Sequence, residues 1–112
     1  MVDDEAIWDL ATNRQGGRAH LVLTGELDLD SAPKLLTAVV EQLESGANEL
    51  VVDLTHLSFI DSSGLGTLVG CWRRATNAGA TLVVANPNED VRMTLEITGL
   101  DQILPITSEV VS

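Results

Sequence analysis

The sequence predicts one α/β domain with a mixed, mostly parallel sheet, in the order β-β-α-β-α-β-α-β. Two observations carry this fold class. Short apolar runs alternate along the chain with segments of helical period, and the first two apolar runs follow each other without a helix between them. Strands that alternate with single helices are joined by right-handed crossovers into a largely parallel sheet. At 112 residues with 45% hydrophobic content, we expect a single domain over 1–112, with a core at about 6–106 and a tail at 107–112.

The first two elements are predicted to be paired strands. Residues 6–12 and 19–27 are short apolar runs, and the polar stretch 13–18 between them contains two adjacent glycines. Two apolar runs that flank a short glycine-containing segment are typical of a hairpin. We therefore expect the hairpin loop over residues 13–18.

The first helix is predicted within residues 27–46, where the apolar period changes from strand-like to helical. Asp30 or Ser31 can cap its start, Pro33 suits its first turn, and Gly46 can end it. The apolar positions that share one face are Leu36, Val39, Val40 and Leu43.

The remaining elements alternate strictly. Residues 48–54 and 80–86 predict buried strands, and residues 65–75 and 88–99 predict helices by their period and their flanking glycines. A short final strand is expected at 102–106. Function in such sheets gathers at the loops that leave the carboxyl ends of strands, and both polar segments there, 24–32 and 56–66, could lie on one edge of the domain.

Charge and composition exclude several classes of function. A net charge of −11 and a pI near 4.2 disfavour binding to nucleic acid or to anionic lipid, and favour partners with a basic patch. No apolar run approaches the roughly 18 residues of a membrane span, and the acidic N-terminus does not resemble a secretory signal, so we expect a cytoplasmic protein. The single cysteine, Cys71, excludes a disulfide framework and is expected to be a modestly exposed free thiol.

Nucleotide, hydrolase and metal sites are poorly supported. The spacing of Gly64, Gly66 and Gly70 misses the dinucleotide fingerprint, and no P-loop pattern exists, so we expect no cofactor. A serine hydrolase needs a histidine base and an exposed elbow; the G-x-S-x-G pattern is absent, and His20 is expected to be an ordinary strand residue. We expect neither an enzyme nor a metal site.

The acidic residues Glu26, Asp28 and Asp30 alternate along one polar segment. On an extended chain such spacing could face a divalent cation. Helix capping and a solvated rim explain these side chains better, because no complete ligand set accompanies them.

Ser62 and Ser63 are the best candidates for chemistry, as acceptors of a phosphoryl group. They lie at the predicted start of a helix, where unpaired N–H groups favour negative charge. A kinase would supply the base, so neither serine needs one of its own. The alternative is that one serine only caps the helix. The residues alone leave these interpretations equal.

Three segments together resemble a known family. "LVLTGELDLDSAPKL", "LSFIDSSGLGTLVG" and "MTLEITGLDQILPI" are similar to the STAS domain of anti-anti-sigma factors, also named anti-sigma factor antagonists, in order and spacing from about Ala19 to Ile106. The resemblance implies a protein that binds an anti-sigma factor with serine kinase activity and thereby frees a sigma factor. It also implies a phosphoserine phosphatase that reverses the modification.

The resemblance assigns the phosphorylated residue to Ser62, the serine that directly follows Asp61. Ser31 stands where the family usually has a threonine and is expected to cap the first helix. The remaining residues that the resemblance places on the partner-binding surface are Asp28, Asp61, Ser63, Gly64, Leu65 and Gly66.

Other STAS proteins suggest an alternative function. A stand-alone accessory subunit of a lipid-transport complex would bind an ATPase partner and would need no phosphoserine; the intact acceptor motif argues against it. A small-ligand site is a third class. We expect a monomer.

Overall fold

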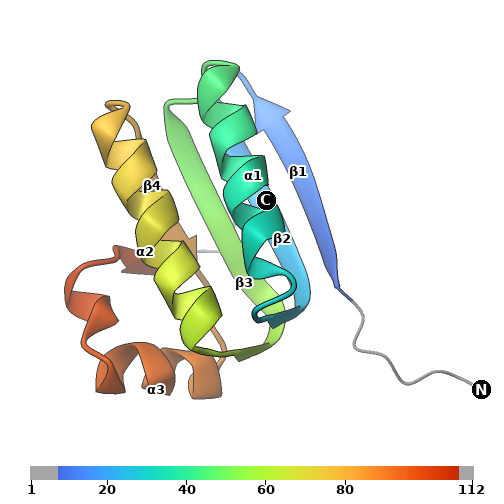
Figure 1. The fold of residues 1–112 in the computed structure, drawn as a ribbon. Coiled ribbons are helices and arrows are strands. Elements are labelled where there is room, and N and C mark those ends of the chain that lie inside the picture. Colours follow the sequence, from blue (N-terminus) through green and yellow to red (C-terminus); the bar gives the residue numbers. More distant parts are fainter. Residues whose placement is uncertain (1–7, 109–112) are drawn as a thin grey trace, which may run out of the picture.

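A computed structural model describes residues 8–108, which form a five-stranded sheet with three α-helices and one 3₁₀ helix (Figure 1). The strands are β1 (Asp9–Gln15), β2 (Arg18–Leu27), β3 (Glu49–Ile60), β4 (Thr81–Ala85) and β5 (Ile106–Thr107). The helices are α1 (Ala32–Glu44), α2 (Ser62–Asn77), α3 (Glu89–Ile97) and the 3₁₀ helix η1 (Leu100–Gln102). The predicted fold class and element order are confirmed.

The strand order in the sheet is β1-β2-β3-β4-β5, the same as the order in the chain. Only β1 and β2 pair antiparallel; the other neighbours are parallel. Right-handed crossovers in one direction place successive helices on one face, and α1 and α2 lie side by side over the same face of the sheet (Figure 1). α3 lies below the sheet, near the start of α2 (Figure 1).

The core lies between this face and the two helices. β2, β3 and β4 contribute side chains with little or no exposure, and in the first half of β2 these alternate with half-buried ones, as the period of a pleated strand requires. The strand residues of the core cluster are Ala19, Leu21, Leu23 and Leu27 from β2, Leu50, Val52, Leu54, Leu57 and Ile60 from β3, and Leu82 and Val84 from β4. On α2 the fully buried face is Leu68, Cys71 and Ala75.

The burial of Cys71 corrects one prediction. Its side chain is 0% exposed, and burial raises the pKa of the thiol to about 12 against the opposing effect of the Arg74 charge. Trp72 is half-buried beside it. The helical period correctly predicts the burial of Leu68 and Ala75, whereas Leu65, Val69 and Trp72 line the edge of the buried face.

The hairpin is tighter than predicted. Its strands extend through Asn13 and Arg14 to Gln15, so the loop contains only Gly16 and Gly17. Gly16 has a φ of +58°, which glycine adopts without strain. The Arg14 guanidinium then donates to Gln42 and Ser45, which ties the hairpin to the end of α1.

The chain after Leu54 is a strand and not the loop that the sequence suggested. β3 continues to Ile60 and pairs with β2 over its whole length, with two irregularities in register. These irregularities break the period of two, so the polar residues His56 and Ser58 resemble a loop in the sequence. The final strand was also misplaced: Gln102 belongs to η1, and β5 contains only Ile106 and Thr107. Of the predicted tail, residues 109–112 lie outside the described residues.

Candidate functional site

Two loops meet at the end of the sheet where β2 and β3 finish. The turn Asp28–Ser31 follows β2, and Asp61–Leu65 follows β3 and starts α2; we name these two segments together the carboxyl edge. The Asp61 N–H donates to the carbonyl oxygen of Leu27, the last residue of β2, at 3.2 Å, which holds the start of the second segment beside the start of the first. The polar segments that the sequence placed on one edge are therefore neighbours.

The Asp28 side chain builds the first segment. Its Oδ1 accepts from the Asp30 and Ser31 N–H groups, each at 3.1 Å. The hydrogen bond from the Ser31 N–H is the main reason why the pKa of the Asp28 carboxyl lies below its ordinary value of 3.8. The next residue, Leu29, is 72% exposed at the tip of the turn. The turn is thus a fixed loop that presents a carboxylate and an apolar side chain.

Ser31 does not cap α1 through its side chain, contrary to expectation. It occupies the N-cap position with helical backbone angles and makes no side-chain cap bond. Its hydroxyl donates instead to the Glu26 carbonyl oxygen at 2.7 Å and accepts from the Asp28 N–H at 2.9 Å. The buried serine therefore closes the turn and anchors it to β2.

Neither serine of the second segment caps α2 either. The N-cap is Asp61, whose backbone is extended and whose Oδ1 accepts from the Gly64 N–H at 2.9 Å. Ser62 is the first residue of the helix and is exposed; Ser63 is half-buried. The Ser62 and Ser63 N–H groups have no hydrogen-bond acceptor among residues 8–108. The cap thus leaves the Ser62 hydroxyl unused at a helix start with two unpaired donors, where negative charge is stabilised.

The two glycines of this segment have different surroundings. Gly64 is buried, and a Cβ there would overlap the Leu27 carbonyl oxygen and come within 2.8 Å of Ile60 Cγ1. Its lack of a side chain therefore serves the contact with β2. Gly66 is exposed, and a Cβ added there would meet nothing within 4 Å. Leu65, between them, is half-buried.

Other candidate sites are weaker. Among residues 8–108 no group of three His, Cys, Asp or Glu side chains could hold a metal ion. A surface groove of about 620 Å³ lies between the last turns of α1 and α2, away from the carboxyl edge. No helix within the described part of the chain is both long and apolar enough to cross a membrane.

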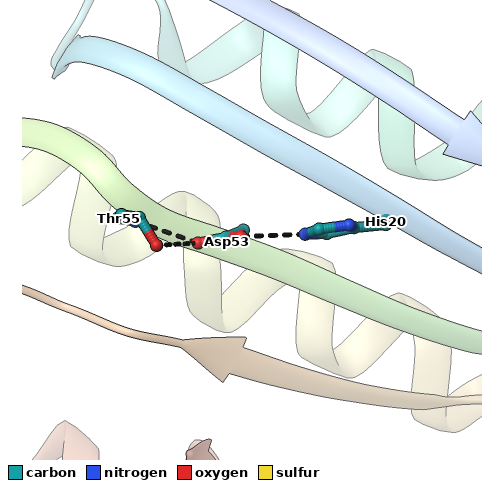
Figure 2. A network of polar contacts seen from close by, with 3 residues as sticks. All are labelled: His20, Asp53 and Thr55. Atoms are coloured by element: carbon teal, nitrogen blue, oxygen red, sulfur yellow. Dashed lines mark hydrogen bonds and ion pairs between the residues drawn. The ribbon is translucent and has the colours of Figure 1, made fainter. Parts of the chain in front are cut away.

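Sequence reasoning missed one polar network. His20 Nε2 lies 2.8 Å from Asp53 Oδ2, and Asp53 Oδ1 accepts from the Thr55 N–H and hydroxyl at 3.0 and 2.6 Å (Figure 2). Burial acts to raise the pKa of the Asp53 carboxyl, but the hydrogen bonds from Thr55 and His20 outweigh it and leave this pKa below 3.8. His20 is thus paired across the sheet; a separation of 33 residues gave no local signal for this contact.

Comparison with known proteins identifies relatives of this chain. The STAS domain family model matches residues 9–112. The anti-sigma-B factor antagonist of Bacillus subtilis (strain 168) is 36% identical over 87 residues, which cover 78% of this chain and 79% of that protein. The anti-sigma-B factor antagonist of Listeria monocytogenes is 36% identical over 94 residues, 83% of this chain and 82% of the other.

The similarity extends to solved structures, which support the fold. An anti-sigma factor antagonist from Mycobacterium paratuberculosis superposes with a TM-score of 0.81 at 23% identity, over 93% of this chain and 88% of the other. The phosphorylated form of the Bacillus cell fate determinant SpoIIAA gives a TM-score of 0.69 at 23% identity, over 92% and 93%. Anti-sigma factor antagonists are regulatory binding proteins and not enzymes, in agreement with the prediction from the residues. The match to the family model and the identity to the Bacillus and Listeria proteins show that this chain belongs to the STAS domain family, among the anti-sigma factor antagonists.

Proposed function

We propose that this protein binds an anti-sigma factor with serine kinase activity through the carboxyl edge, and that phosphorylation of Ser62 weakens this binding. The observation that carries the proposal is the exposed position of Ser62 at the start of α2. Asp61 caps this helix, and two unpaired N–H groups lie beside the Ser62 hydroxyl. Release of a sigma factor from the occupied anti-sigma factor is the expected outcome, and a phosphoserine phosphatase would restore binding.

The carboxyl edge has the features of a docking surface. It presents the exposed Leu29 and the Asp28 carboxylate on a turn held by several hydrogen bonds. Such preorganisation lowers the entropy cost of binding. Ser63, Leu65 and Gly66 continue this surface along the first turns of α2. The acidic net charge of the chain favours a partner with a basic surface.

The same geometry supports a phosphorylation switch. A phosphoserine carries about −1.5 to −2 charges at neutral pH. The free N–H groups of Ser62 and Ser63 can donate hydrogen bonds to the phosphate, so α2 need not unfold. The added charge would lie between Asp61 and a docked partner. A penalty of about 3 kcal/mol from steric overlap and from desolvation of the phosphate in the interface would weaken binding more than a hundredfold. The switch therefore needs no large change of conformation.

The test uses the purified anti-sigma factor kinase from the same organism, with ATP and Mg²⁺. We expect intact-mass measurement to detect one phosphate on the wild type and on the matched control Ser63→Ala, and none on Ser62→Ala. The isolated phosphoprotein should bind the kinase at least about a hundredfold more weakly than the unmodified protein in calorimetry. Phosphate on Ser62→Ala would refute the assignment of the serine, and equal affinity of both forms would refute the switch.

A further inference from the structure

β3 contains an extra residue in its pairing with β2, close to the polar network of Figure 2. Val22 pairs with Asp53 and Thr24 pairs with His56. One residue, Leu23, thus lies opposite two, Leu54 and Thr55, which is the pattern of a β-bulge. A bulge leaves the N–H of its extra residue without a partner in the ladder.

Asp53 provides that partner. Its Oδ1 accepts from both the N–H and the hydroxyl of Thr55, so one carboxylate oxygen holds the bulged residue at two points (Figure 2). Its Oδ2 contacts His20 on β2, the strand that pairs with the bulged strand β3. Asp53 is 7% exposed, and carboxylates are seldom buried to this extent without such partners. Asp53 therefore links the bulge to the neighbouring strand.

The bulge determines which residues of β3 face the helices. Leu54 and Leu57 are both buried, whereas regular alternation after Leu54 would turn His56 inward. The bulge also decides which residue of β3 pairs with Leu27. That residue is Ile60; without the bulge, and with the second one-residue shift, between Leu57 and Phe59, retained, Leu27 would pair with Phe59. The place of Asp61 beside Leu27 thus depends on the bulge.

We infer that Asp53 is a positioning residue for the carboxyl edge: by holding the bulge at Leu54–Thr55, it places Asp61 and Ser62 beside the Asp28 turn. The inference deepens the proposed function and rests on it where binding is concerned. A second irregularity, between Leu57 and Phe59, is held separately by the Ser58 hydroxyl, which donates to the Gly25 carbonyl oxygen at 3.0 Å. Loss of the Asp53 carboxylate should therefore release the first irregularity while the second persists.

The test compares Asp53→Ala with Asp53→Asn in the full chain. Alanine removes every contact of the carboxylate. Asparagine keeps an oxygen that accepts from Thr55, and its amide can donate to His20 Nε2 when the neutral ring carries its proton on Nδ1. Val39→Ala, in the buried face of α1 and outside both strands, is the control for a general loss of stability. Hydrogen exchange of single amides is measured by NMR at a temperature where each variant is folded.

We expect the Asp61 and Gly64 amides of Asp53→Ala to exchange about tenfold faster or more, relative to amides of α1 and β4 in the same variant. Asp53→Asn should restore the wild-type ratio to within about threefold, and Val39→Ala should leave the ratio unchanged. If Asp53→Ala does not fold, Thr55→Val, which removes only the hydroxyl bond, should change the ratio in the same direction. Wild-type exchange ratios in a folded Asp53→Ala or, failing that, in Thr55→Val would overturn the inference.

Binding to the anti-sigma factor kinase gives the second measurement. Asp53→Ala should lose about tenfold or more in affinity, and Asp53→Asn should regain it. A folded Asp53→Ala that binds as tightly as the wild type overturns the inference. A wild-type protein that does not bind the kinase refutes the proposed function instead, and the exchange ratios then decide the positioning role alone.

Discussion

Gly64 and Gly66 lie two residues apart on α2, and the same substitution should have opposite effects at the two positions. At Gly64 a new Cβ would overlap the Leu27 carbonyl oxygen and lie 2.8 Å from Ile60 Cγ1 and 2.9 Å from Leu27 Cγ. The carbonyl cannot move away without disturbing its hydrogen bond from the Asp61 N–H. At Gly66 nothing lies within 4 Å of the added atom.

The magnitudes follow from these contacts. Overpacking of this kind costs about 1–3 kcal/mol, and the contact with backbone favours the upper end. Alanine regains about 1 kcal/mol over glycine inside a helix. Gly64→Ala should therefore lower the free energy of unfolding by about 2 kcal/mol, whereas Gly66→Ala should raise it by about 1 kcal/mol. A difference of about 3 kcal/mol corresponds to about 12–24 °C in the unfolding temperature of a domain near this size.

The assay is thermal and urea-induced unfolding of both variants, followed by circular dichroism. Gly70→Ala is the matched control, since a Cβ at this helical position also meets nothing within 4 Å and should raise stability like Gly66→Ala. Equal stability of Gly64→Ala and Gly66→Ala would refute the explanation that close approach to Leu27 requires a glycine at position 64.

Three further predictions concern single side chains. Asp61→Ala should lower the free energy of unfolding by about 1 kcal/mol, because the Gly64 N–H loses its acceptor, and Asp61→Asn should retain most of it; urea unfolding distinguishes them. The pKa of Asp53 is lower in the folded state than its ordinary value of 3.8, so its ionised form stabilises the fold above that pH, and this contribution is lost as pH falls through the folded pKa. The stability difference between the wild type and Asp53→Asn should accordingly shrink on acidification from pH 6 to about pH 2, and a constant difference across this range would contradict the role of the carboxylate. Cys71, with a pKa raised to about 12, should react with a thiol reagent at pH 8 only after unfolding, and rapid reaction of the native protein would disprove its burial.

The helices and strands could be predicted from the sequence where the apolar residues had a regular period or where a glycine marked the end of a helix. α1 and α3 end near Gly46 and Gly99, which have φ values of +98° and +76°. Glycine tolerates positive φ, so a glycine after a helical period predicts the end of the helix. The alternating β and α segments likewise predicted the parallel sheet. Local patterns of this kind depend on residues within one or two turns of each other.

The sequence was insufficient where pairing between distant segments decides the structure. The second half of β3 resembled a loop because two irregularities put Leu57 out of alternation with both Leu54 and Ile60. The contact of His20 with Asp53 has no local signature. At the carboxyl edge the sequence located both segments, but the cap on α2 is Asp61, and Ser31 closes the preceding turn, because these roles depend on where β2 and β3 end relative to each other.

The identical order of strands in the chain and in the sheet also has a consequence for biosynthesis. Each strand after β1 pairs with the strand made just before it, so the sheet can extend in the direction in which the ribosome delivers the chain. No strand among residues 8–108 has to insert between two that are already paired, a step that would delay folding through distant contacts. The carboxyl edge is complete once α2 has emerged. β4 and β5 are added afterwards and widen the sheet beyond β3. Nascent chains should therefore acquire the Asp28 turn and the start of α2 before the last strands are synthesised.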